Sequence, residues 1–251
     1  SGAKVNHDLA PMGLWYAIAF DNALHDPSLR RIFASLEKHG LTFFLVVSAL
    51  IAAAGFEFRK RPAVPVCFVT LTTGFAVMVL ELLLIFIYQV WSGYVFYEIG
   101  MLITMLMTGM ALGALCAGKF LKRSGSALRA LVAAEAFLAA VCLIVPAIFL
   151  TTHMYLSPGR LSARLLALAL LFISGFFAGM EYPVAVEAYR NIRPQRTAVG
   201  PVYGLDLIGG FAGGVAGGFF LFPLMGLVKT CIFLFAVKVC GILMLLSPRR
   251  K

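Results

Sequence analysis

The sequence predicts an all-α integral membrane protein: a bundle of about seven transmembrane helices with an amphipathic helix before it. Hydrophobic residues make up 61% of the 251 residues and charged residues only 13%, whereas soluble globular chains carry about a quarter charged residues. So much apolar surface requires lipid as its solvent, because the polar residues are too few to coat a soluble globule. The apolar residues also fall into long runs separated by short connections, which is typical of a chain that crosses a membrane several times.

The first of two predicted domains, residues 1–40, differs in composition from the rest. It holds several charged residues and only short apolar pieces. Within residues 27–39 the apolar residues recur at three- and four-residue steps, at Leu29, Ile32, Phe33 and Leu36. This spacing predicts an amphipathic helix that lies on the membrane surface or on a neighbouring helix.

The second predicted domain, residues 41–251, is the transmembrane bundle. Each apolar run can cross roughly 30 Å of hydrocarbon at 1.5 Å per residue, the first of them only marginally. The connections are short and rich in proline, glycine and arginine. The predicted spans are residues 41–56, 64–89, 99–118, 130–152, 165–185, 203–222 and 227–246.

The basic residues predict the orientation of the chain. The net charge of +10 does not indicate a nucleic-acid partner, because these residues form short clusters between apolar runs rather than one polar face. Alternate connections and the C-terminus carry thirteen of them, against two on the opposite connections. This bias predicts a cytoplasmic C-terminus in an inner membrane of bacterial type, and anionic lipid headgroups as partners. Seven spans would then place residues 1–40 on the outer side of the membrane. The basic residues Arg30, Arg31 and Lys38 argue against that placement.

Ionisable residues inside the predicted spans need an explanation, because charge at membrane depth is costly. Lys238 is the one base well inside a span. The acids at such positions are Glu81, Glu135, Glu181, Glu187 and Asp206. They form either a polar track for protons or a cationic substrate, or structural pairs with loop arginines or a lysine.

The structural interpretation is favoured for Glu135, six residues from Arg129, and for Glu187 and Asp206 near the span ends. Glu81 has no basic residue near it in the sequence and is the first candidate for function. The candidate intramembrane polar site consists of Glu81, Gln89, Glu181 and Asp206.

Glycines in the span 203–222 predict close helix packing. They stand four residues apart in two columns, Gly209, Gly213 and Gly217, and Gly210, Gly214 and Gly218. A helix face without side chains lets another backbone approach closely. A phosphate-binding loop is excluded, because the run lies inside an apolar span and follows no strand. Gly109 and Gly113 predict the same kind of contact for the span 99–118.

The sequence shows no motif for catalysis, a cofactor or a metal. The five cysteines lie in apolar runs without C-x-x-C spacing, and no histidine stands near them at the spacing of metal ligands. No Ser/His/Asp grouping, Walker loop or zinc pattern is found. We therefore expect no catalytic residue, no cofactor and no metal in this chain.

Two resemblances to known families add to this picture. Residues 109–125, GMALGALCAGKFLKRSG, resemble the loop motif of major-facilitator transporters, Gly-x-x-x-Asp-Arg-x-Gly, with Lys122 at the aspartate position. Residues 78–118, 174–183 and 206–210 resemble the membrane part of bacterial spermidine-synthase-like integral membrane proteins. Over about residues 65–226 this resemblance implies a major-facilitator-like bundle. It does not imply aminopropyltransferase activity, which would need a Gly-rich nucleotide loop after a strand.

Three functions follow from these observations. The first is a major-facilitator-like half-bundle that handles a small or cationic molecule. The second is a non-catalytic membrane subunit that anchors a larger assembly, such as an electron-transfer complex, or that forms a homodimer. The third is the membrane part of a polyamine enzyme whose catalytic part lies on another chain.

Overall fold

The structure, a computed structural model, describes residues 63–92, 98–155, 161–195 and 197–246. Its elements are α3 (Val64–Ser92), α4 (Ile99–Ser124), α5 (Ala127–Tyr155), α6 (Leu161–Ile192), α7 (Val199–Ala216), the π-helix η1 (Gly217–Leu221) and α8 (Phe222–Leu246). The predicted all-α fold class is confirmed for these ranges. The predicted amphipathic helix, the predicted span 41–56 and the domain boundary at residue 40 lie outside the described residues.

Five helical segments, not seven, are long and apolar enough to cross a membrane in the described part of the chain. They are Val64–Val90, Ile99–Ser124, Ala127–Thr151, Arg164–Ile192 and Val199–Leu246. The last segment is 48 residues long and contains both of the spans predicted at 203–222 and 227–246. The five helices indicate a polytopic integral membrane protein, whereas the cytoplasmic placement of the C-terminus stays a prediction.

The 48-residue segment is not one straight rod. Gly226 interrupts α8 with φ 71° and ψ −179°, a backbone conformation that favours glycine. The Thr230 hydroxyl donates a hydrogen bond to the carbonyl oxygen of Leu221 at 3.1 Å. Nine residues of a straight helix would separate these two positions by about 13.5 Å. The chain therefore bends back at Gly226, which is where the sequence predicted the break between two spans.

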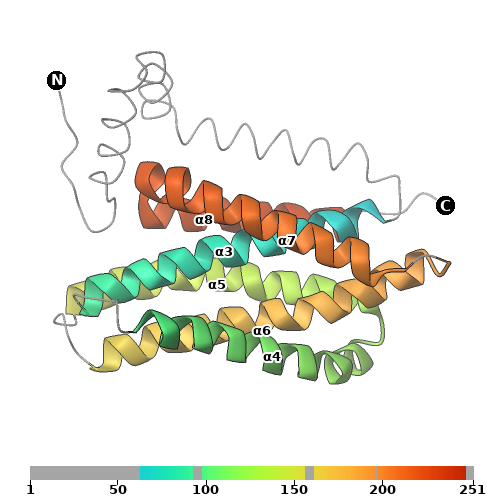
Figure 1. The fold of residues 1–251 in the computed structure, drawn as a ribbon, viewed down its shortest axis with the longest axis horizontal. Coiled ribbons are helices and arrows are strands. Elements are labelled where there is room, and N and C mark those ends of the chain that lie inside the picture. The colour runs from blue at the N-terminus through green and yellow to red at the C-terminus, as the bar shows by residue number, and fades with distance from the viewer. Residues whose placement is uncertain (1–62, 93–97, 156–160, 196, 247–251) are drawn as a thin grey trace, which may run out of the picture.

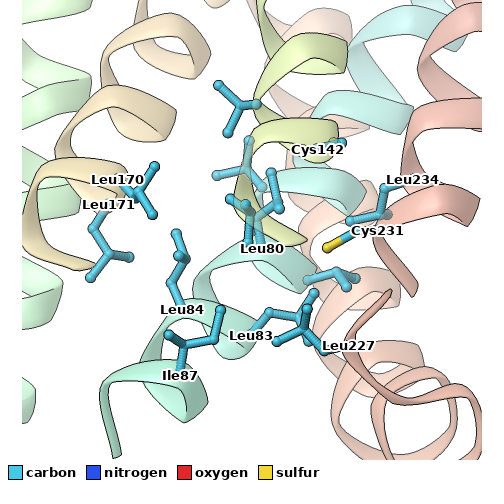
Figure 2. Close-up of a cluster of buried hydrophobic side chains, with 14 of the residues drawn as sticks. Leu80, Leu83, Leu84, Ile87, Cys142, Leu170, Leu171, Leu227, Cys231 and Leu234 are labelled. Atoms are coloured by element: carbon cyan, nitrogen blue, oxygen red, sulfur yellow. The ribbon is translucent and has the colours of Figure 1, made fainter. Parts of the chain in front are cut away.

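The helices pack lengthwise into an elongated bundle (Figure 1). In that view α4 and α6 lie along one side, α7 and α8 along the other, and α3 and α5 between them. The closest pairs are α4 with α6, α3 with α7, and α5 with α8. A leucine-rich core fills part of the interior, as Figure 2 shows with Leu80 of α3, Leu171 of α6 and Leu234 of α8.

Helices α4 and α6 approach each other through glycines on both sides. A Cβ atom at Gly113 would lie 1.9 Å from the carbonyl oxygen of Phe176, and one at Gly179 would lie 2.1 Å from that of Met110. Side chains cannot occupy such positions, so the backbones meet only because these residues are glycine. Two more glycines are equally close to the partner backbone, Gly109 and Gly175.

Helix α7 uses one of its two glycine columns in the same way. A Cβ atom at Gly209 would lie 2.0 Å from the carbonyl oxygen of Leu71 in α3, and one at Gly213 would lie 2.4 Å from that of Phe75. The other column, Gly210, Gly214 and Gly218, would meet atoms of α3 only at 3.4–3.9 Å, which is ordinary van der Waals contact. The two columns therefore have different roles, which the sequence pattern alone could not distinguish.

This difference allows a matched pair of substitutions at neighbouring positions. Gly213→Ala is expected to lower the thermal stability of the detergent-extracted protein, because the new methyl group pushes against the α3 backbone. Gly214→Ala is expected to leave it unchanged or to raise it, since alanine is favoured over glycine in a helix interior by about 1 kcal/mol. Equal thermal stabilities of the two variants would contradict the contact between α3 and α7.

Candidate functional site

Four buried polar residues from four helices meet inside the bundle: Thr73 of α3, Glu135 of α5, Glu181 of α6 and Lys238 of α8. The Lys238 ammonium donates hydrogen bonds to Glu135 Oε1 at 2.6 Å and to Thr73 Oγ1 at 2.5 Å. The Thr73 hydroxyl is also hydrogen-bonded to Glu135 Oε1 at 2.9 Å and to Glu181 Oε1. We call these four residues the polar cluster.

The polar cluster lies about a third of the way along the helical segments that are long and apolar enough to cross a membrane. Counted from the segment ends next to the basic connections, its members stand between eight and eleven residues inside their segments. At 1.5 Å per residue this is about 12–17 Å from those ends. The cluster thus places charged groups well inside the apolar segments, where an unpaired charge is costly.

Local features of α3 and α8 make room for the cluster. The Thr73 hydroxyl lies 3.0 Å from the carbonyl oxygen of Val69, one turn earlier, which fixes its rotamer in the way common for threonine in helices. Gly241 stands one turn after Lys238, and a Cβ atom there would lie 3.1 Å from Glu135 Oε2. A larger residue at position 241 would therefore press on the Glu135 carboxylate.

Of the four residues predicted for the polar site, Glu181 is the one that belongs to the cluster. Glu81 stands eight residues from Thr73 along α3, about 12 Å away, and is half-buried. Gln89 is exposed near the end of α3. Asp206 of α7 is half-buried, with its backbone against Gly74 of α3, and interacts electrostatically with Lys238. The structure therefore places Asp206 beside the cluster, and Glu81 and Gln89 apart from it.

Not all of the buried acids have the basic partners that the sequence predicted for them. Glu135 forms its ion pair with Lys238, 103 residues away in the sequence, and not with Arg129. Glu187 does pair with an arginine, Arg190, at 3.0 Å on the exposed surface, but Arg190 lies in the last turn of α6 and not in a loop. The signal in the sequence was Lys238, because a lone base inside a span requires a buried acid as its partner. Nothing in the sequence marked Thr73.

Comparison with known protein families, curated proteins and solved structures finds no match for this chain. The functional argument therefore rests on the chemistry of the cluster. Two carboxyl groups, one ammonium and one hydroxyl can bind a proton or a second cation, because the acids outnumber the base.

Proposed function

We propose that the protein is a membrane module that handles a small or cationic molecule, with the polar cluster as its internal binding site. The observation that carries this proposal is the position of Glu181. This residue is 1% exposed, touches the Lys238–Glu135 ion pair through Thr73, and has no hydrogen-bond partner for Oε2 among the described residues. A structural ion pair needs one acid and one base, and Glu181 is a second acid.

Burial of the second acid, Glu181, lowers the stability of the bundle. A buried ion pair contributes little net stability, because the desolvation of both charges offsets their attraction. A further carboxyl group in the same place adds its own desolvation without a basic partner. A residue of this kind inside a membrane bundle is by default a functional candidate. We infer that Glu181 is there to bind a positive charge.

The resemblance to spermidine-synthase-like membrane proteins supports this proposal and suggests which molecule to test. Glu181 falls in residues 174–183 and Asp206 in residues 206–210, two of the stretches that resemble spermidine-synthase-like membrane proteins. Such a resemblance points to a polyamine as the cationic molecule, and to a major-facilitator-like bundle as the fold. Spermidine is therefore the first molecule to test.

The test is uptake of radiolabelled spermidine into liposomes that contain the purified protein. Saturable uptake is expected for the wild type. Glu181→Gln is expected to reduce it by about tenfold or more, because a charge-assisted hydrogen bond to a cation contributes roughly 1.5–3 kcal/mol. The matched control is Glu187→Gln on the same helix, where an exposed ion pair with Arg190 is removed and uptake should persist.

Three outcomes would contradict the proposal. Wild-type uptake no greater than that of protein-free liposomes would exclude spermidine transport. Stoichiometric partner subunits after native purification, together with absent uptake, would favour the alternative of a non-catalytic assembly subunit. Equal uptake by the wild type and Glu181→Gln would remove the polar cluster from the function.

A further inference from the structure

The hydrogen bonds of the polar cluster need more protons than two ionised carboxylates allow. Thr73 Oγ1 accepts a hydrogen bond from the Lys238 ammonium. It also lies within hydrogen-bond distance of three acceptor oxygens: the Val69 carbonyl oxygen, Glu135 Oε1 and Glu181 Oε1. A hydroxyl group has one hydrogen to donate. Three acceptors therefore compete for one hydrogen, unless one of the contacting oxygens carries a proton of its own.

Both carboxyl groups contact the same hydroxyl, which cannot donate to both. Glu135 Oε1 and Glu181 Oε1 each lie within hydrogen-bond distance of Thr73 Oγ1, yet ionised carboxylates only accept hydrogen bonds. Glu135 Oε1 already accepts from the Lys238 ammonium at 2.6 Å, which favours its ionised form. The ion pair found for Lys238 is with Glu135, so Glu181 lacks this direct stabilisation. The proton is therefore assigned to Glu181.

We propose that Glu181 is a proton-binding site, and that a cationic substrate exchanges with this proton at the polar cluster. The identity of the substrate rests on the proposed function. The assignment of a proton to Glu181 rests only on the hydrogen-bond geometry of the cluster. In the exchange, the carboxylic acid releases its proton to water as the cation arrives, and the carboxylate that remains pairs with one positive charge of the cation. The charge at Glu181 balances, because one positive charge of the cation replaces the proton.

Charge balance supports the assignment. With both acids ionised, the two carboxylates and the ammonium would carry a net charge of −1 in the bundle interior. With Glu181 protonated the cluster is neutral, which avoids burying an unpaired charge. Among the described residues, the other titratable groups near the cluster are Asp206 from α7 and Cys142 from α5, and both interact electrostatically with Lys238. Neither supplies a second positive charge that could hold Glu181 ionised.

Infrared difference spectroscopy of the protein in lipid vesicles tests this proposal without any transported substrate. At neutral pH the wild type is expected to show the carbonyl band of a protonated carboxyl group, and this band should shift when the sample is exchanged into D₂O. The band should be missing in Glu181→Gln. It should persist in Glu187→Gln, whose carboxylate is exposed and paired, and it should persist at a shifted frequency in Glu181→Asp.

The results separate this proposal from the proposed function. Identical spectra for the wild type and Glu181→Gln would overturn the proton site, while spermidine uptake would still support the binding site. A band lost in Glu135→Gln but kept in Glu181→Gln would also overturn it, because the proton would then sit on the other acid. If the carbonyl band of Glu181 is present but spermidine uptake is absent, the proton site is confirmed and the proposed function is contradicted.

Discussion

Gly113→Leu is expected to leave little folded protein after detergent extraction. A Cβ atom at this position would lie 1.9 Å from the carbonyl oxygen of Phe176, so the leucine can be placed only if α4 and α6 move apart. Overpacking of side chains costs about 1–3 kcal/mol, and displacement of a whole helix costs more. The yield of monodisperse protein and its midpoint of thermal unfolding measure the effect.

The control lies on the same helix. A Cβ atom at Gly118 would meet no atom within 4 Å in the described part of the chain. Gly118→Leu adds the same side chain to α4 and should purify with the stability of the wild type. If both variants behave alike, α4 does not pack against α6 through Gly113, and the arrangement of these two helices is wrong.

Lys238→Met should destabilise the protein by about 3–5 kcal/mol, because it leaves the buried Glu135 carboxylate without its cation. Methionine keeps most of the volume of lysine, so the loss reports the charge rather than a cavity. The free energy of unfolding can be measured by reversible titration with sodium dodecyl sulfate in mixed micelles.

Lys229 supplies the comparison for this substitution. It stands on α8 like Lys238 but is exposed. Lys229→Met should change the free energy of unfolding by no more than about 0.5 kcal/mol, as is usual for surface substitutions. A loss of similar size in both variants would mean that Lys238 is not buried against an acid.

The sequence was sufficient for the class of protein and for the centres of the described helices, and less so for their ends. The span predicted to end at residue 118 continues as α4 to Ser124, through Lys119, Lys122 and Arg123. Basic residues favour the C-terminal end of a helix, and their long side chains extend toward the headgroups. The span predicted to end at residue 185 likewise continues as α6 to Ile192.

The number of spans differs at one junction. Six of the seven predicted spans fall in the described part of the chain, and five helical segments are found there, because the spans predicted at 203–222 and 227–246 both belong to Val199–Leu246, which bends back at Gly226. The π-helical turn Gly217–Leu221 lies inside the span predicted at 203–222 and joins α7 directly to α8.

The candidate site was only partly predictable, because its members are far apart in the sequence. Thr73 and Glu135 are 62 residues apart, and Thr73 and Lys238 are 165 residues apart. Reasoning along the chain assigned Glu135 to the nearby Arg129, but Arg129 is exposed whereas Glu135 faces α8. Glu81 was ranked first because it is isolated in the sequence. Isolation along the chain says nothing about the neighbours that packing brings to a residue.

The most direct test of the polar cluster is a double-mutant cycle on Glu135 and Lys238. The free energy of unfolding is measured for the wild type, Glu135→Gln, Lys238→Met and the double variant, in the same mixed micelles. If the two side chains form the buried pair at 2.6 Å, the double variant should lose about 2–3 kcal/mol less than the sum of the single losses, because neither charge is left alone. Losses that add to within about 0.5 kcal/mol would mean that the residues do not touch, and the cluster would not exist.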